Sequence, residues 1–281
     1  KTAGQTPRTA ATTASTDRRR RIAIRTMAEG AGTSPSPLCA TKTYIGSMSA
    51  ESKPILRVAS WNIRAGLGTD LRRDADRVLA GIAGLQADIV ALQEADFRLG
   101  ERPSALPRDR IAALTGLEPL PIGRNAVSLG WHGNALLARP GIRLTGLDRL
   151  DLPVHEPRGA VIVDLDTPAP LRVVAVHLGL LRAARRRQLD AIKAALNRHP
   201  ARPTVILGDF NEHSRRVGLG RIATPFLILP TAATFPSRRP FLPLDRIVHS
   251  PDLDLIPLGL APTNGHQPSD HQPLLAELRW R

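Results

Sequence analysis

One short segment joins an apolar strand to groups that could act on a phosphate. Residues 205–213 read VILGDFNEH, in which three apolar residues and a glycine lead to Asp209, Phe210 and Asn211. Gly, Asp and Asn are also common turn formers, so a strand followed by an ordinary turn explains the segment as well. Side chains alternate along an extended chain, so we expect Asp209 and Asn211 to point to one side and Phe210 into the core. A carboxylate and an amide held in this way could bind one phosphate together.

Polar residues stand at or beside the ends of the other predicted strands as well. They are Asn62 in ILRVASWNI, Glu94 in DIVALQEAD, His177 in LRVVAVHLG, Asp245 in LDRIVHS, and Asp270 with His271 in PSDHQPLLAEL. Taken singly, each is more often a cap, a turn residue or a satisfied core group. Strand ends that meet at one edge of a rigid sheet hold side chains at fixed separations. Taken together, the positions predict one polar site at such an edge.

The elements that must position these residues follow an α/β pattern. From residue 55 onward, short apolar runs typical of strands alternate with segments of helical periodicity. Helices are predicted within 71–85 and at about 182–198. Strands are predicted at 55–63, 88–96, 133–139, 160–165, 171–179, 204–211, 244–250 and 271–280. This alternation predicts one α/β domain with mixed sheets.

Residues 1–50 differ in composition from the rest of the chain. They are rich in Thr, Ala, Ser, Pro and Arg and show no hydrophobic periodicity, so they are expected to be disordered. The pattern also resembles a transit peptide, but the sequence does not begin with Met, and a natural start at Met48 or Met27 is the preferred interpretation. We therefore expect a non-native or dispensable extension over 1–50 and a single domain over 51–281.

Composition excludes several classes of protein. The single cysteine, Cys39, leaves neither a disulfide framework nor a cysteine-based zinc site. No apolar run approaches the roughly 18 residues of a membrane span, so a cytoplasmic protein without a transmembrane segment is expected. The formal net charge is +14, but basic and acidic residues are interspersed along most of the chain. The charge therefore indicates either a solvated surface or a polyanionic partner.

The ordered motifs resemble those of a known superfamily. SWNIRAG, DIVALQEAD, GNALLAR, VHLGL, ILGDFNEH, LDRI and PSDHQPLLAEL together resemble the endonuclease/exonuclease/phosphatase superfamily of metal-dependent phosphoesterases. The resemblance covers residues 55–281. It implies an α/β four-layer sandwich, in which two mixed β-sheets pack face to face and are flanked by helices. It also implies that 51–281 is a catalytic domain with its active site at one edge of the sandwich.

The resemblance implies a divalent cation as the cofactor. Glu94 matches the principal metal ligand, and Asn62 and Asp270 are expected nearby as direct or water-mediated ligands. Carboxylate and amide oxygens are the ligands that Mg²⁺ prefers, and Mn²⁺ is the alternative ion. Such an ion would neutralise charge on the phosphoryl oxygens of the substrate.

The same resemblance suggests roles for the other polar residues. Asp209 would orient or activate the attacking water, or assist a metal, and Asn211 would donate to a phosphoryl oxygen. His271 would act as general base or as an electrostatic clamp on the phosphate, with Asp245 as its orienting partner. His177 would bind a phosphoryl oxygen or protonate the leaving group, with Glu156 as a partner.

Basic residues near these motifs are weaker candidates for substrate binding. Arg158 either supports the site or makes a surface salt bridge. Arg182 and Arg185, within an arginine cluster that directly follows VHLGL, either steer an anionic substrate or belong to a solvated helix face. His132 and His213 match no required position.

These residues predict a metal-dependent hydrolase of phosphoesters, most simply a phosphodiesterase or nuclease-like enzyme that forms no covalent intermediate. The partner is an anionic phosphoester, with nucleic acid among the candidates. A sphingomyelinase-like enzyme of phospholipid headgroups or small phosphorylated metabolites is the alternative, and a catalytically silent binding module is a third reading. A monomer without an obligate protein partner is expected.

Overall fold

The computed structural model describes residues 54–153, 158–214, 217–259 and 266–281. The expected extension over residues 1–50 lies outside the described residues, and so does Glu156, the residue expected to pair with His177.

The described strands form two mixed sheets of six strands each. The first sheet has the order β11 (Leu253–Leu258), β12 (Leu274–Trp280), β1 (Ile55–Asn62), β2 (Ile89–Gln93), β4 (Ala135–Ala138) and β3 (Glu118–Pro119). The second sheet has the order β5 (Arg143–Asp151), β6 (Gly159–Asp166), β7 (Leu171–His177), β8 (Thr204–Asp209), β10 (Asp245–His249) and β9 (Leu227–Ile228). Each sheet has one central parallel pair, β1 with β2 and β7 with β8, and its other pairs are antiparallel.

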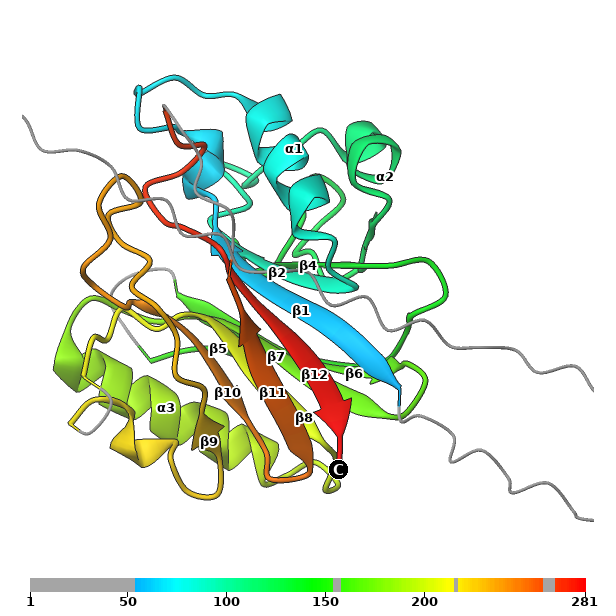
Figure 1. The fold of residues 1–281 in the computed structure, drawn as a ribbon, viewed down its shortest axis with the longest axis vertical. Helices are drawn as coiled ribbons and strands as arrows, with labels where there is room; N and C mark the ends of the chain where they lie inside the picture. Colours follow the sequence, from blue (N-terminus) through cyan, green and yellow to red (C-terminus); the bar gives the residue numbers. More distant parts are fainter. Residues whose placement is uncertain (1–53, 154–157, 215–216, 260–265) are drawn as a thin grey trace, which may run out of the picture. The chain divides into compact units, whose positions relative to one another are not determined.

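Helices cover the outer face of each sheet. The helices are α1 (Ala75–Leu85), α2 (Arg108–Thr115) and α3 (Arg182–Leu196), with short 3₁₀ turns η1 (Arg64–Gly66) and η2 (Leu219–Arg221). The α1 and α2 helices lie on one side of the strands and α3 on the other (Figure 1). The α1 helix begins after Asp74, because the Asp74 carboxylate accepts hydrogen bonds from the backbone N–H groups of Asp76 and Arg77. No helix within the described ranges is both long and apolar enough to cross a lipid bilayer.

Three apolar cores separate the layers. The core between the two sheets includes Leu56, Val58, Val173, Leu207 and Ile247. A second core fills the space between the first sheet and helices α1 and α2, and a third lies between the second sheet and α3. Strands that bury both faces read as nearly continuous apolar runs, which explains the segments IVAL and VVAV. The four-layer sandwich predicted from the sequence is confirmed.

The core between the sheets ends in a polar layer at one edge. In β7, Leu171, Val173 and Ala175 face the first sheet, so His177 is the next side chain in the same row. By the same alternation, Asp209 follows Leu207 in β8, Asp245 precedes Ile247 in β10, and Asn62 ends the row of β1. Register pairs His177 with Asp209 and Asp209 with Asp245. The fold therefore places His177, Asp209 and Asp245 at one level of the second sheet, with Asn62 of the first sheet in contact with Asp209.

Candidate active site

Asp209 is the centre of the polar layer. It is 1% exposed, and its Oδ2 accepts a hydrogen bond of 3.0 Å from Asn62 Nδ2 of the facing sheet. The same oxygen lies 3.5 Å from His177 Nε2 and 3.8 Å from His271 Nε2. The carboxylate therefore joins four segments that are far apart in the sequence.

The glycine before Asp209 has a structural reason. A Cβ atom at Gly208 would lie 1.9 Å from the carbonyl oxygen of Val176 on β7, which is closer than any side chain can approach. Glycine lets the two strands come together here, as is common where backbones approach closely. The residue thus helps to bring Asp209 next to His177, its register partner on β7.

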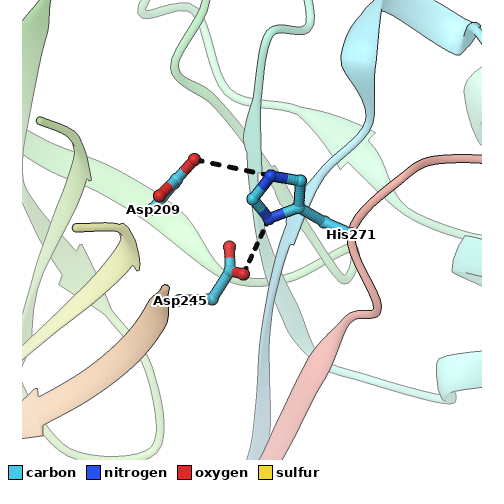
Figure 2. A group of neighbouring side chains, drawn as sticks. All are labelled: Asp209, Asp245 and His271. Carbon is cyan, nitrogen blue, oxygen red and sulfur yellow. Dashed lines mark hydrogen bonds and ion pairs between the residues drawn. The ribbon is translucent and has the colours of Figure 1, made fainter. Parts of the chain in front are cut away.

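His271 lies between two carboxylates (Figure 2). Its Nδ1 is 2.8 Å from Asp245 Oδ2, and the same oxygen accepts a hydrogen bond of 2.5 Å from Thr234 Oγ1. Trp61 Nε1 donates to the backbone carbonyl of His271 at 2.9 Å, which ties the loop before β12 to β1. Because Nδ1–H donates to Asp245, the other ring nitrogen faces Asp209.

The surroundings separate the pKa values of the three titratable groups at this centre. Burial and the neighbouring Asp245 raise the pKa of Asp209 to about 7. Burial by itself would lower the pKa of His271, but Asp245 and Asp209 raise it to about 9. Burial, followed by the Arg158 guanidinium, lowers the pKa of His177 well below its usual value. At neutral pH the site therefore holds an imidazolium at His271, a neutral imidazole at His177, and a carboxyl between them that titrates near neutrality.

The His271–Asp245 pair should make stability depend on pH. The folded pKa of His271 is raised from 6.5 to about 9, so its stabilising contribution is fully present below pH 6.5 and is lost as the pH rises through about 9. We expect His271→Gln to lower the melting temperature of metal-free protein more at about pH 6 than at about pH 10. Thermal unfolding followed by circular dichroism measures this difference. His199→Gln, which removes a half-exposed pair with Asp148, is the control and should have the smaller effect. An equal loss for His271→Gln at both pH values would contradict the assignment.

Asn211 does not follow the extended geometry expected from the sequence. The β8 strand ends at Asp209, and Asn211 has a left-handed backbone with φ 49°. Its backbone N–H donates to Asp209 Oδ1 at 2.9 Å, and its side-chain Nδ2 donates to the Leu178 carbonyl at 2.9 Å. Asn211 is therefore next to Asp209, but its side-chain amide is directed at the end of β7. The sequence predicted that the amide and the Asp209 carboxylate would point to the same side. Phe210 is fully buried, as predicted.

Glu94 and Arg158 face a pocket beside this centre. Glu94 follows β2 with a left-handed backbone, φ 53°, and its carboxylate pairs with Arg98 at 3.0 Å. Arg158 is buried, and its Nη1 lies 2.5 Å from His177 Nε2 and 2.9 Å from His177 Nδ1. Glu94, Arg158 and His177 line the same pocket. Arg158 therefore contacts a residue of the candidate site.

Asp270 lies next to His271 and pairs with Arg64. The distance from Arg64 Nε to Asp270 Oδ2 is 3.3 Å. The backbone N–H of Arg64 also donates to Asn62 Oδ1 at 3.0 Å, so this arginine contacts two of the residues expected to bind metal.

Arg185 neither faces solvent nor is free to steer a substrate, which were the two roles expected from the sequence. It is buried, and its Nη2 donates to Glu212 Oε2 at 2.8 Å. The reason is helical periodicity, because Arg185 shares the inward face of α3 with Leu189 and Ile192. Arg182 is half exposed, and its Nε lies 3.8 Å from the same carboxylate oxygen. The two arginines therefore converge on the segment after β8.

The donor set suits an oxygen-preferring cation. Among the described residues, the group that could hold a metal ion is Asp209, Asp245 and His271, whose candidate ligand atoms lie within 4.8 Å of one another. Within the described ranges, Asp245 Oδ1 is buried without a hydrogen-bond partner. Carboxylate oxygens fit Mg²⁺ or Mn²⁺, whereas an imidazolium cannot be a ligand. This group differs from the expected set of Glu94, Asn62 and Asp270, although Asn62 contacts it through Asp209.

Several residues at the site were not predicted from the sequence. His132, set aside in the sequence, lines the pocket with Arg98 and Arg102. Arg102 Nη1 lies 2.9 Å from His132 Nδ1, and His132 Nε2 lies 2.7 Å from Asp151 Oδ1. Thr234 holds Asp245 from a loop without any strand pattern. The only sequence signal was the His-Gly pair in GWHGN, which is typical of a tight turn.

A sandwich of this kind, with acidic, amide and histidine side chains at the ends of both central parallel pairs, has the architecture of the deoxyribonuclease I-like phosphoesterases. The sequence agrees with the architecture. The chain belongs to the Endonuclease/Exonuclease/phosphatase family, which residues 59–271 match. Members of this family hydrolyse phosphoester bonds and are generally dependent on divalent metals.

The comparisons include a curated relative and several solved structures. Escherichia coli K12 protein YbhP, described as uncharacterized, is 37% identical over 169 residues, which are 56% of this chain and 66% of YbhP, just under two thirds of its length. A Bacteroides thetaiotaomicron family protein has a TM-score of 0.63 and 18% identity, with 82% of this chain and 99% of that chain covered. The mannosyl-6-phosphatase Bt3783 of the same species has a TM-score of 0.60 and 19% identity, with 80% of this chain and 100% of that chain covered. Danio rerio TDP2, complexed with single-strand DNA product, has a TM-score of 0.62 and 15% identity, with 80% of this chain and 99% of that chain covered. At these identities the solved structures share the fold.

Proposed function

We propose that this protein is a divalent-metal-dependent phosphodiesterase or nuclease-like hydrolase. The observation that carries the proposal is the position of Asp209, which is buried between His271 and His177 with its pKa raised to about 7. A carboxylate that titrates near neutrality is suited to take a proton from water at the pH of a cell. A structural acid would gain nothing from burial beside Asp245, because that arrangement costs stability.

Glu94, Asn62 and Asp270 are proposed to hold Mg²⁺ or Mn²⁺, with Asp209 or Asp245 contributing an oxygen. The bound ion would neutralise charge on the phosphoryl oxygens. Arg98 Nη2 donates to Glu94 Oε1 at 3.0 Å, and Arg64 Nε lies 3.3 Å from Asp270 Oδ2, so each of these carboxylates also has an arginine partner.

The protein's own residues are proposed to divide the remaining work. Asp209 accepts a proton from the attacking water, and Asn62 orients the Asp209 carboxylate. His271, held by Asp245, donates from Nε2 to a phosphoryl oxygen as an imidazolium. His177, which is neutral, donates a hydrogen bond to a phosphoryl or leaving oxygen and is held by Arg158. Asn211 supports this edge through the Leu178 carbonyl.

The substrate class is part of the proposal. TDP2 with bound single-strand DNA and a mannosyl-6-phosphatase share this fold, so the fold accommodates both nucleic acids and small phosphoesters. A nucleic-acid-like diester is favoured because three arginines and two histidines line the pocket beside Glu94. Phospholipid headgroups or small phosphorylated metabolites are the alternative, while the intact polar layer argues against a silent binding module. The cytoplasmic location, the monomeric state and the limits of the catalytic domain, 51–281, stay predictions from the sequence.

A substrate panel tests this proposal. Supercoiled plasmid, single-stranded DNA, RNA, bis-p-nitrophenyl phosphate, sphingomyelin and mannose 6-phosphate are each incubated with Mg²⁺, Mn²⁺ or EDTA. Metal-dependent cleavage of diesters is expected, and His271→Gln should abolish it. Cleavage confined to phosphomonoesters would contradict the diester assignment, and the absence of cleavage in every case would favour a binding module.

If nucleic acid is the substrate, its affinity should fall steeply with salt, because binding releases counterions from several phosphates. We expect the affinity for a long DNA to fall by about a hundredfold or more between about 50 and 200 mM salt. Arg182 and Arg186, on the exposed side of α3, can be changed together to Ser without touching buried Arg185. That variant should flatten the slope and leave bis-p-nitrophenyl phosphate hydrolysis unchanged. A salt slope that is equal in both proteins would place the DNA-contacting surface elsewhere.

A further inference from the structure

We infer that the pocket beside Glu94 and His177 binds a second phosphate of the substrate, next to the phosphate that is cleaved, and that Arg102 is its specificity-determining residue. The inference rests on the proposed function, because it takes Glu94 and His177 as the residues that meet the cleaved group. The pocket is lined by Glu94, Asp96, Phe97, Arg98, Arg102, His132, Gly133, Arg158 and His177.

The carboxylates of this pocket are already satisfied, and its arginines are not all neutralised. Asp96 accepts hydrogen bonds from the backbone N–H groups of Leu129 at 2.6 Å and Gly130 at 3.0 Å, and the charges of Arg108 and Arg102 act on it without a direct ion pair. Glu94 pairs with Arg98. No carboxylate of the described residues lies within ion-pair distance of Arg102, whose side-chain contact is the imidazole of His132. The pocket therefore presents a guanidinium with spare donors, which suits a phosphate.

Arg102, His132 and Asp151 form a row of three hydrogen-bonded side chains that holds the Arg102 guanidinium in place. Its Nη1 donates to His132 Nδ1 at 2.9 Å, which leaves His132 Nε2–H to donate to Asp151 Oδ1 at 2.7 Å. Asp151 ends β5 in the second sheet, whereas Arg102 belongs to the loop after β2 in the first. His132 is thus a positioning residue that fixes the guanidinium between the two sheets.

The backbone around His132 supports this role. His132 and Gly133 have φ values of 50° and 82° and form a two-residue turn closed by hydrogen bonds of 2.9 Å in both directions between Trp131 and Asn134. The turn packs against Gly159, where a Cβ atom would lie 2.9 Å from His132 Cδ2. Glu94, Arg102 and His132 all adopt left-handed backbone conformations, which non-glycine residues rarely do outside turns and functional sites.

A matched substrate pair tests the inference. The 4-nitrophenyl ester of thymidine 5′-phosphate is assayed with either a free 3′-hydroxyl or a 3′-phosphate, so that the cleaved bond is the same. We expect the wild-type kcat/KM to be at least about tenfold higher with the 3′-phosphate, through a lower KM, which is the size of one charge-assisted contact. Arg102→Gln should abolish this preference and leave the 3′-hydroxyl substrate within about twofold of wild type.

Further variants and substrates separate the possible outcomes. His132→Gln should raise KM for the 3′-phosphate substrate without changing kcat on the 3′-hydroxyl substrate. Arg139→Gln, at the opposite end of β2 and β4 beside Asp88, is the control and should behave as wild type. Glucose 1,6-bisphosphate and glucose 6-phosphate repeat the comparison for small molecules. A preference in the nucleotide pair alone identifies a neighbouring nucleotide as the source of the second phosphate, and one in the sugar pair alone identifies a small bisphosphate. No preference in either pair, or an equal loss on both members in Arg102→Gln, overturns the inference.

A binding measurement keeps the inference separate from the proposed function. Calorimetric titration of the metal-free protein with inorganic phosphate should show binding that Arg102→Gln weakens at least about tenfold and Arg139→Gln retains. If no phosphoester is cleaved, the proposed function fails, and the titration alone decides the pocket. Absence of binding, or equal binding by wild type and Arg102→Gln, then overturns the inference.

Discussion

Asp209→Asn should lower kcat by about a thousandfold while raising the melting temperature of the metal-free protein. The loss of activity follows from removing a general base, whose contribution is about a hundred- to ten-thousandfold. The gain in stability follows from burial and from the neighbouring Asp245, which raise the pKa of Asp209 from 3.8 to about 7. Asn keeps the size of the side chain and one carbonyl oxygen, which can accept from Asn62 Nδ2 or from the Asn211 N–H but not from both, because these donors bind different carboxylate oxygens of Asp209.

The pH dependence of this stabilisation has a definite sign. A carboxyl whose folded pKa is raised destabilises the folded state where it is ionised, so the cost is absent below about pH 3.8 and is fully present above about pH 7. The difference in melting temperature between Asp209→Asn and wild type should therefore be largest above pH 7 and shrink as the pH falls. Asp190→Asn, which removes an exposed carboxylate paired with Arg221, is the control and should change neither property much. If Asp209→Asn is less stable than wild type at about pH 8, the ionised Asp209 carboxylate stabilises the folded protein, and the expected gain in stability is wrong.

Glu94→Gln should weaken Mg²⁺ binding and reduce turnover by at least about a hundredfold, the size of losing one well-placed electrostatic group. The amide retains an oxygen but not the charge that attracts a divalent ion. Calorimetry with Mg²⁺ and steady-state kinetics over a range of metal concentrations measure the two effects. If the substitution weakens only the affinity for the metal ion, a saturating concentration of Mn²⁺ should restore part of the turnover.

The control for Glu94 is Glu118→Gln, an exposed acid on the edge strand β3 of the same sheet. It should leave metal affinity and turnover unchanged. Unchanged metal binding in Glu94→Gln would instead assign the ion to the buried group of Asp209 and Asp245, where the candidate ligand atoms already lie within 4.8 Å of one another.

Buried strands were predictable because their sequences are nearly all apolar. The strands β1, β2, β6, β7 and β8 and the helix α3 lie where periodicity placed them. The strand β5, RLTGLDRLD, was missed because it lies at a sheet edge, where alternating residues are exposed or only half-buried. The helix α2 buries a single apolar residue, Ile111, and so has no apolar stripe to reveal it.

The polar layer was predictable where residues continue an apolar row, and not where loops supply them. Alternation in β7, β8 and β10 placed His177, Asp209 and Asp245 at one edge. Asn211 departs from alternation because β8 ends one residue after Gly208, and a left-handed backbone turns the amide toward Leu178. Arg102 and His132 meet only because loops from two different sheets converge, which no local pattern encodes.

Hydrolysis of bis-p-nitrophenyl phosphate by the wild-type protein, measured before and after metal removal, shows whether Asp209 belongs to a metal-dependent phosphoesterase. The protein is treated with EDTA, dialysed, and assayed without metal, with Mg²⁺, with Mn²⁺ and with Ca²⁺. We expect activity to disappear on chelation, to return with Mg²⁺ or Mn²⁺, and to stay about a thousandfold lower in Asp209→Asn when either metal is present. Activity that persists in EDTA, or that Asp209→Asn retains in full, would contradict a metal-dependent phosphoesterase centred on this residue.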